Sequence, residues 1–238
     1  MTVGAIVFTR MRSTRLPGKA LLPIGEQPLL GWVLRRARRA KGVERVVVAT
    51  STDPSDDPVE TFARETGAPV YRGPLDNVAA RALGCAREFG FAAFTRVCGD
   101  RLFLEPSHIE AAVARFSEPG EPIDVVSNTL AGPVPPGLTT EVVRTDALAE
   151  ALAHTSDPQD LEHVTRYFYA HAERFRIVWG GIVPSALNGL RFVVDTPEDL
   201  QRARYIVARL ADPSTATLAQ VAALARTWDQ QRLEYCDV

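Results

Sequence analysis

"VGAIVF" (residues 3–8) and "RVVVAT" (residues 45–50) are short, continuous apolar runs rich in β-branched residues. Such runs are typical of strands that are buried on both faces of a sheet. Between them, "PLLGWVLRRARRAK" (residues 28–41) repeats apolar residues at helical spacing and carries its arginines on the opposite face. The three segments predict a βαβ unit, in which a helix joins two parallel strands.

The alternation of strand and helix continues along the chain. It predicts helices at 57–67, about 76–89 and 106–116, with strands at 68–72, 92–100 and 123–128. A Pro/Gly-rich loop from about residue 129 leads to an edge strand at "EVV" (141–143). Helices at 145–153, 158–173 and 197–211, strands near 175–179 and 190–194, and an amphipathic stretch at 215–228 follow. We expect one α/β domain over 1–238, a mostly parallel sheet with helices on both faces, and a small inserted subdomain at 129–180.

The composition is that of an ordinary globular protein, with 46% hydrophobic and 24% charged residues in a chain of 238. A formal net charge of −2 lacks the global attraction of a nucleic-acid binder, so we expect a small anionic ligand and no nucleic acid. The three cysteines have no metal-binding spacing, and the first apolar run is too short for a signal-peptide core or a membrane span. The expected location is therefore the cytoplasm, away from the membrane.

"RMRSTRLPGK" (residues 10–19) gathers three arginines and one lysine directly after the first predicted strand. It has neither GxxxxGK[ST] nor GxGxxG, so the spacing fits a phosphate cradle and a solvated basic turn about equally. Guanidinium groups grip phosphate oxygens in a bidentate manner, and Ser13 can add a hydroxyl. Pro17 and Gly18 would form the turn that returns Lys19 to Arg10 and Arg15.

Two carboxylates follow other predicted strands, at the sheet edge where ligands bind. Asp100 in "CGD" is either a turn cap or a ligand. In "VVDTPEDL" (193–200) Thr196 can cap the helix that begins at Pro197. Asp195 is therefore not needed as a cap, and it stands at the end of a predicted strand. Two such carboxylates suit Mg²⁺ on a nucleotide. Arg72, after the third strand, joins the candidate nucleotide-binding residues.

Several motifs together resemble the CMP-sugar synthetases, over about residues 3–210 in collinear order. They are "RMRSTRLPGKALLPIGEQPLL", "VVVATSTDPSDDPVE", "YRGPLDNVAARAL", "RVCGD", "VSNTL", "GLTTEV", "EHVT" and "LRFVVDTPEDL". The likeness is greatest to the spore coat polysaccharide biosynthesis protein F type, with the CMP-Kdo and CMP-N-acetylneuraminate synthetases behind it. It implies a glycosyltransferase-A-like Rossmann-type sheet and a cytidylyltransferase that uses CTP and a sugar-type acceptor.

The resemblance also implies roles for individual residues. Arg10, Ser13, Arg15 and Lys19 match the triphosphate loop, and Asp100 and Asp195 match the Mg²⁺ carboxylates. Asp76 and Arg81 fall in a segment near the nucleotide, whereas Glu141, Glu162 and His163 match positions on the acceptor side. Without the family, His163 has the alternative reading of a packed or capping histidine. A homodimer is implied too, with contact near 129–180.

The chain departs from the family pattern at Phe8, Arg12, Asn77, Arg101 and Thr139. These departures concern the base and the acceptor more than the phosphates and the metal. They keep open a nucleotide-binding module that has lost catalysis, because Arg101 replaces a small residue beside the expected metal position. A glycosyltransferase with this fold is the other alternative, although the lone "GD" at 99–100 lacks the usual DxD motif.

Overall fold

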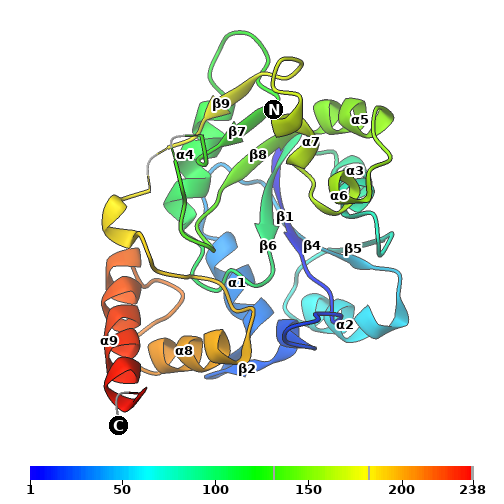
Figure 1. Cartoon of the computed structure of the whole chain (residues 1–238). Helices are drawn as coiled ribbons and strands as arrows, with labels where there is room; N and C mark the ends of the chain where they lie inside the picture. Colours follow the sequence, from blue (N-terminus) through cyan, green and yellow to red (C-terminus); the bar gives the residue numbers. More distant parts are fainter. Residues whose placement is uncertain (131, 182, 237–238) are drawn as a thin grey trace.

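A seven-stranded sheet runs through the computed structural model, which describes residues 1–130, 132–181 and 183–236 (Figure 1). Its strands lie in the order β5 (Val70–Gly73), β4 (Val46–Ser51), β1 (Val3–Phe8), β6 (Ala93–Cys98), β8 (Glu141–Arg144), β7 (Val125–Ser127) and β9 (Ile177–Trp179). Only β8 is reversed, pairing antiparallel with β6 and β7, while the other neighbours are parallel. The prediction of a mostly parallel α/β sheet is confirmed.

Helices cover both faces of the sheet, as the continuous apolar strands require. One core includes side chains from α1 (Leu29–Ala37), α2 (Asp57–Glu65), α4 (Pro106–Phe116), α8 (Pro197–Val207) and α9 (Leu218–Cys236). The other includes side chains from α3 (Val78–Glu88), α5 (Thr145–Ala153) and α7 (Arg166–Ala170), and α6 (Pro158–Glu162) packs against α3. Successive residues of β1 and β4 enter opposite cores, since side chains alternate along a strand.

The helix starts follow from local sequence. Pro106, Pro158 and Pro197 each occupy the first turn of a helix, where a missing N–H costs nothing. Thr196 caps α8, as the sequence predicted, and the side chain of Asp199 caps in return by accepting from the Thr196 backbone. Within the described residues, none of the helices combines the length and apolar character that crossing a membrane would need.

The structure corrects four predicted elements. The predicted edge strand, β8, lies inside the sheet between β6 and β7. Residues 190–194 form no strand, because Phe192 N and Val194 N donate to two separate loops, at Pro136 O and Asp100 O. The predicted helix at 158–173 breaks into α6 and α7, and the final helix is displaced to 218–236. A short hairpin of β2 (Pro23–Ile24) and β3 (Gln27–Pro28) was not predicted.

The segment predicted as an inserted subdomain, residues 129–180, is continuous with the sheet. It supplies β8 and β9 to the sheet, and its helices α5 and α7 add side chains to the second core. In Figure 1 these elements lie in the upper part of the molecule, above the strands from the first half of the chain. The late segment therefore extends the same sheet beyond β6 and shares its second core.

Candidate active site

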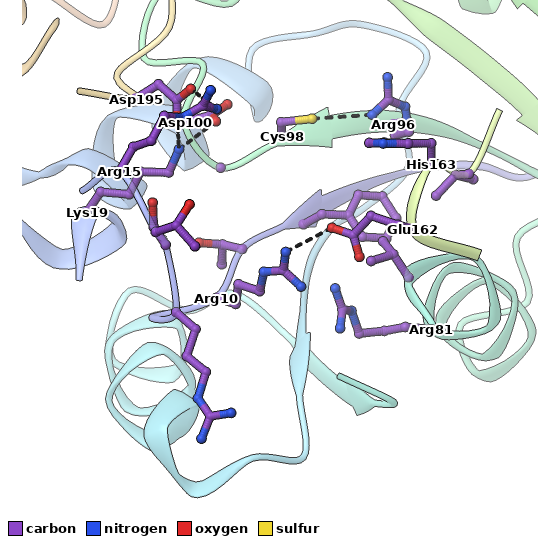
Figure 2. A pocket seen from close by; sticks show the side chains of 18 residues that line it. Arg10, Arg15, Lys19, Arg81, Arg96, Cys98, Asp100, Glu162, His163 and Asp195 are labelled. Carbon is purple, nitrogen blue, oxygen red and sulfur yellow. Dashed lines mark hydrogen bonds and ion pairs between the residues drawn. The ribbon is translucent and has the colours of Figure 1, made fainter. Parts of the chain in front are cut away.

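A cavity of about 410 Å³ opens at the carboxyl ends of β1 and β6 (Figure 2). This is the edge at which open α/β sheets bind ligands. Most of the predicted site residues line it: Arg10, Ser13, Arg15, Lys19, Arg81, Asp100, Glu162, His163 and Asp195. Residues separated by more than 170 positions in the sequence thus share one cavity.

The loop after β1 is folded by its own backbone. Gly18 N donates to Met11 O at 2.9 Å, and Gly18 has a φ of 70°, which glycine adopts without strain. Ser13 Oγ accepts from Leu16 N at 3.3 Å. The turn at Pro17 and Gly18 leads into the short 3-10 helix η1 (Lys19–Leu21), so Lys19 returns to the cavity as predicted.

A buried carboxylate ties this loop to the neighbouring strand. Asp56 is 0% exposed and accepts hydrogen bonds from Met11 N at 2.7 Å, from Ser51 N at 3.0 Å and from Ser51 Oγ. Ser51 ends β4, so Asp56 joins two strand ends. Asp56 was not predicted as a site residue, because it stands among three aspartates in "STDPSDD" that all resemble turn caps.

Lys19 connects the two predicted metal carboxylates. Its Nζ lies 2.8 Å from Asp100 Oδ2 and 2.9 Å from Asp195 Oδ1, and Arg15 also pairs with Asp195. Burial alone would lower the pKa of Lys19, but the two carboxylates raise it. Burial alone would raise the pKa of Asp195, but Lys19 and Arg15 lower it. Lys19 and Asp195 are therefore both charged at neutral pH.

The opposite end of the cavity is also rich in cations. Arg10 Nη2 lies 2.8 Å from Glu162 Oε1, which joins the basic loop to the end of α6. Arg81 is 2% exposed and donates to Pro74 O at 2.7 Å, and no carboxylate of the described residues forms an ion pair with it. Burial and the charge of Arg10 lower the pKa of Arg81. An anion in this cavity would offset that buried charge.

His163 reaches the cavity because the helix breaks there. It ends α6 with φ of −106° and ψ of 86°, outside the helical region. Val164, the next residue, also lines the cavity and is buried in the second core. The break in the helix at 163–165 thus brings both residues to the cavity.

Glu141 is not among the residues that line the cavity. It is 3% exposed and forms an ion pair with Arg96, whose Nε donates to Glu141 Oε2 at 2.7 Å. Burial alone would raise the pKa of Glu141, but Arg96 and Tyr169 lower it. Arg96 itself lines the cavity, together with Cys98, and neither was predicted as a site residue. The feature that could have identified Arg96 is its charge, which is unusual inside the apolar strand "AFTRVC".

Two other predicted nucleotide-binding residues also lie outside the cavity. Arg72 pairs with Asp57 at 2.6 Å and Glu60 at 2.9 Å, and donates to the carbonyl of Ser51 at 2.8 Å. Its role in the structure is to connect β5 with α2. Asp76 is exposed on the loop before α3 and does not line the cavity.

The departures from the family pattern separate into two groups. Phe8 and Arg12 line the cavity, whereas Asn77 caps α3 by accepting from Ala80 N at 2.7 Å. Arg101 is buried and turned away from the cavity, and its Nη1 donates to the carbonyl of Thr139. Arg101 and Thr139, two of the residues that depart from the family pattern, thus contact each other, and Arg101 does not crowd Asp100.

Comparisons with known proteins agree with this geometry. A family model described as cytidylyltransferase matches residues 4–233. The chain is 26% identical over 226 residues to the spore coat polysaccharide biosynthesis protein SpsF of Bacillus subtilis, covering 92% of each chain. It is 30% identical to the 3-deoxy-manno-octulosonate cytidylyltransferase of Anaeromyxobacter dehalogenans, covering 87% of this chain and 98% of the relative.

A solved structure shows the same architecture. A cytidylyltransferase from Leptospira borgpetersenii matches 96% of each chain with a TM-score of 0.89 and 25% sequence identity. The matches extend over the basic loop, the strand ends and the segment before α8, which are the parts that build the cavity. The chain therefore belongs to the cytidylyltransferase family and is a nucleotidyltransferase.

Proposed function

We propose that this enzyme transfers CMP from CTP to a hydroxyl group of a sugar acid and releases pyrophosphate. The observation that carries the proposal is the convergence of Arg15, Lys19, Asp100 and Asp195 at one end of the cavity. The 3-deoxy-manno-octulosonate cytidylyltransferase among its relatives supports CTP and a sugar acid as the substrates.

The proposed reaction is an in-line displacement at the α-phosphorus of CTP. A bond forms between the acceptor oxygen and the α-phosphorus, the bridging bond to the β-phosphate breaks, and the hydroxyl proton is lost to solvent. Arg10, Arg15 and Lys19 would bind the β- and γ-phosphates, since fixed cations stabilise the charge that develops on the leaving group. Ser13 would donate its hydroxyl to the same phosphates.

Asp100 and Asp195 are the residues that would hold Mg²⁺. The described residues contain no cluster of three or more His, Cys, Asp or Glu side chains for a metal, so the triphosphate would supply the remaining oxygen ligands. The donor set fits a cation, because both carboxylates already converge on the Lys19 ammonium. Bound there, Mg²⁺ would neutralise phosphate charge and assist ionisation of the attacking hydroxyl. Lys19 would then turn to the phosphates.

The other cavity residues would divide between nucleotide and acceptor. Arg81 is proposed to contact the nucleotide, and Glu162 and His163 the acceptor, because these last two end α6 beside the second half of the sheet. Arg72, Asp76 and Glu141 would act indirectly, since they do not line the cavity.

We also propose a cytoplasmic homodimer. Among the described residues, three large apolar side chains are exposed, and two of them, Leu130 and Trp179, lie in segment 129–180. Trp179 ends the edge strand β9, so a second copy would cover it. Cytoplasm is the compartment in which CTP is available. Light scattering of wild type and of Trp179→Glu would test the dimer.

The test of the reaction is pyrophosphate release with each of the four nucleoside triphosphates and Mg²⁺, against a panel of sugar acids and neutral sugars. Release with CTP and an acid is expected, and Asp195→Asn should abolish it while the protein stays folded. Asp146→Asn, the same change at an exposed position outside the cavity, is the matched control. Turnover by Asp195→Asn at moderate Mg²⁺ would refute the metal assignment.

A further inference from the structure

Arg96 occupies the end of the cavity opposite to Lys19. Figure 2 shows Arg96, His163 and Glu162 on one side and Lys19, Asp100 and Asp195 on the other. Thr95 and Val97, its neighbours on β6, are both buried. Alternation along the strand places Arg96 and Cys98 together on the cavity face.

The Arg96 guanidinium is bound by Glu141, a residue that does not line the cavity. Its Nε and Nη2 lie 2.7 and 2.6 Å from Glu141 Oε2, and the hydroxyl of Tyr169 donates to the other oxygen of Glu141 at 2.7 Å. Tyr169 Oη also lies 2.8 Å from Ser127 Oγ. Glu141 thus has both oxygens engaged, and β8 and α7 together fix the orientation of Arg96.

One amino group of Arg96 lacks a strong acceptor. Among the residues that the structure describes, Nη1 has only the sulfur of Cys98 as an acceptor, 3.4 Å away, and a thiol is a weak acceptor. The side chain is 20% exposed although the rest of it is packed. A charged donor that is rigidly held and incompletely satisfied is suited to bind an oxygen anion.

The charge at this end of the cavity favours a single negative charge on the ligand of Arg96. In the proposed function Arg10 and Arg81 contact the nucleotide, so Arg96 is the arginine at this end that remains for the acceptor among the described residues that line the cavity. The Arg96 charge is already shared with Glu141, and Glu162 also faces the cavity. A carboxylate brings one negative charge to this donor, whereas a phosphate dianion would bring a second charge beside Glu162.

We propose that Arg96 binds the carboxylate of the acceptor through Nη1 and so selects sugar acids over uncharged sugars. Glu141 and Tyr169 are positioning residues for Arg96 and do not contact the acceptor. This inference rests on the proposed function, because it names the residue that recognises the acceptor of that reaction.

The test compares two acceptors on two enzymes. The acceptors are a sugar acid that the wild-type enzyme uses and its carboxamide, which has nearly the same shape without the charge. The variant is Arg96→Gln/Glu141→Gln, which removes both members of the pair and leaves no unpaired buried charge. The matched control is Arg144→Gln/Asp124→Asn, which removes another arginine–carboxylate pair, between β8 and the start of β7, outside the cavity.

A charge-assisted hydrogen bond predicts a loss of about 10- to 100-fold in kcat/KM for the acid in the Arg96 variant. The loss should appear in KM for the acid, with kcat and KM for CTP nearly unchanged, and the preference for acid over amide should disappear. Tyr169→Phe should raise KM for the acid by a smaller factor. The control variant should keep the wild-type preference.

The outcomes separate this inference from the proposed function. If the wild type releases no pyrophosphate with any acceptor, the proposed function itself is refuted. If it does, but the folded Arg96 variant discriminates acid from amide as the wild type does, Arg96 is not the carboxylate residue. Weakened CTP binding by that variant in calorimetry would assign Arg96 to the nucleotide and also overturn the inference.

Discussion

Replacing Asp56 should both destabilise the fold and weaken binding of CTP. In Asp56→Ala the amides of Met11 and Ser51 lose their acceptor, and Ser51 is 0% exposed. An unsatisfied buried donor costs about 1–3 kcal/mol, so the two amides together lower the free energy of unfolding by about 4 kcal/mol. For a chain of this size that lowers Tm by about 8–16 °C.

The same change should reach the active site, because Met11 N belongs to the loop that carries Arg10 and Arg15. We expect KM for CTP to rise even well below the melting temperature. Asp56→Asn keeps one acceptor oxygen and should fall between wild type and Asp56→Ala in both measurements.

The control is Asp57→Asn, the same kind of change at the next residue, where the side chain is 60% exposed and makes a surface ion pair with Arg72. A pair of this kind contributes about 0–1 kcal/mol, so Tm should change by less than about 4 °C. The measurements are thermal melts by circular dichroism and CTP titration by calorimetry. An Asp56→Ala protein that melts close to wild type, or that melts early but binds CTP unchanged, would refute the reasoning.

Three further predictions concern the cavity. Gly99→Ala should lower both activity and Tm, because a Cβ at this position would lie 2.7 Å from Thr9 Cβ and force apart the two strand ends. Full activity of this variant in steady-state assays would show that the added Cβ does not disturb the site. Burial raises the pKa of Cys85 to about 12, so a thiol reagent at pH 8 should label Cys98 and not Cys85 in the folded protein. Because Cys98 lines the cavity, bound CTP should slow the labelling of Cys98. Peptide mapping measures which cysteine is labelled and how fast. The lowered pKa of Asp195 means that its ion pairs stabilise the fold fully above about pH 4 and are lost as pH falls through the folded pKa. The Tm difference between wild type and Asp195→Asn should therefore be constant from pH 5 to 8 and shrink below about pH 4, and a difference that is undiminished at pH 3 would contradict it.

The sequence predicted the first half of the fold well, because its strands are buried on both faces and its helices have clear apolar stripes. The strand Val3–Phe8 matches its predicted run, and Val46–Ser51 ends one residue beyond its predicted run of 45–50. The two strands pair in the predicted parallel manner. The later elements were harder to predict from the sequence, because some of their apolar residues are buried without taking part in the sheet. Leu190, Phe192 and Val194 alternate as in a strand and are buried, yet their segment packs as an isolated extended chain.

The candidate site divides in a similar way. Residues at strand ends or in the basic loop, such as Lys19 and Asp100, were predicted because the topology of parallel sheets fixes where strand ends meet. Asp56 and Arg96 were missed because their importance depends on which side chain each one touches. Arg101 was placed beside the metal position through the resemblance to the family motif, and the structure turns it toward Thr139.

The reversed strand β8 has a consequence for how the molecule assembles. β7 precedes β8 in the sequence but reaches the sheet only through it, and β9 in turn reaches it only through β7. A nascent chain can therefore pair β5, β4, β1 and β6 early, but it presents an open β6 edge until residues 141–144 have been synthesised. The ion pair between Arg96 and Glu141 crosses this junction, so pairing of β8 with β6 also fixes Arg96 in the cavity, whereas Glu162, His163 and Asp195 come from chain that is synthesised later. During synthesis, the site thus comes into being only when both halves of the protein have joined.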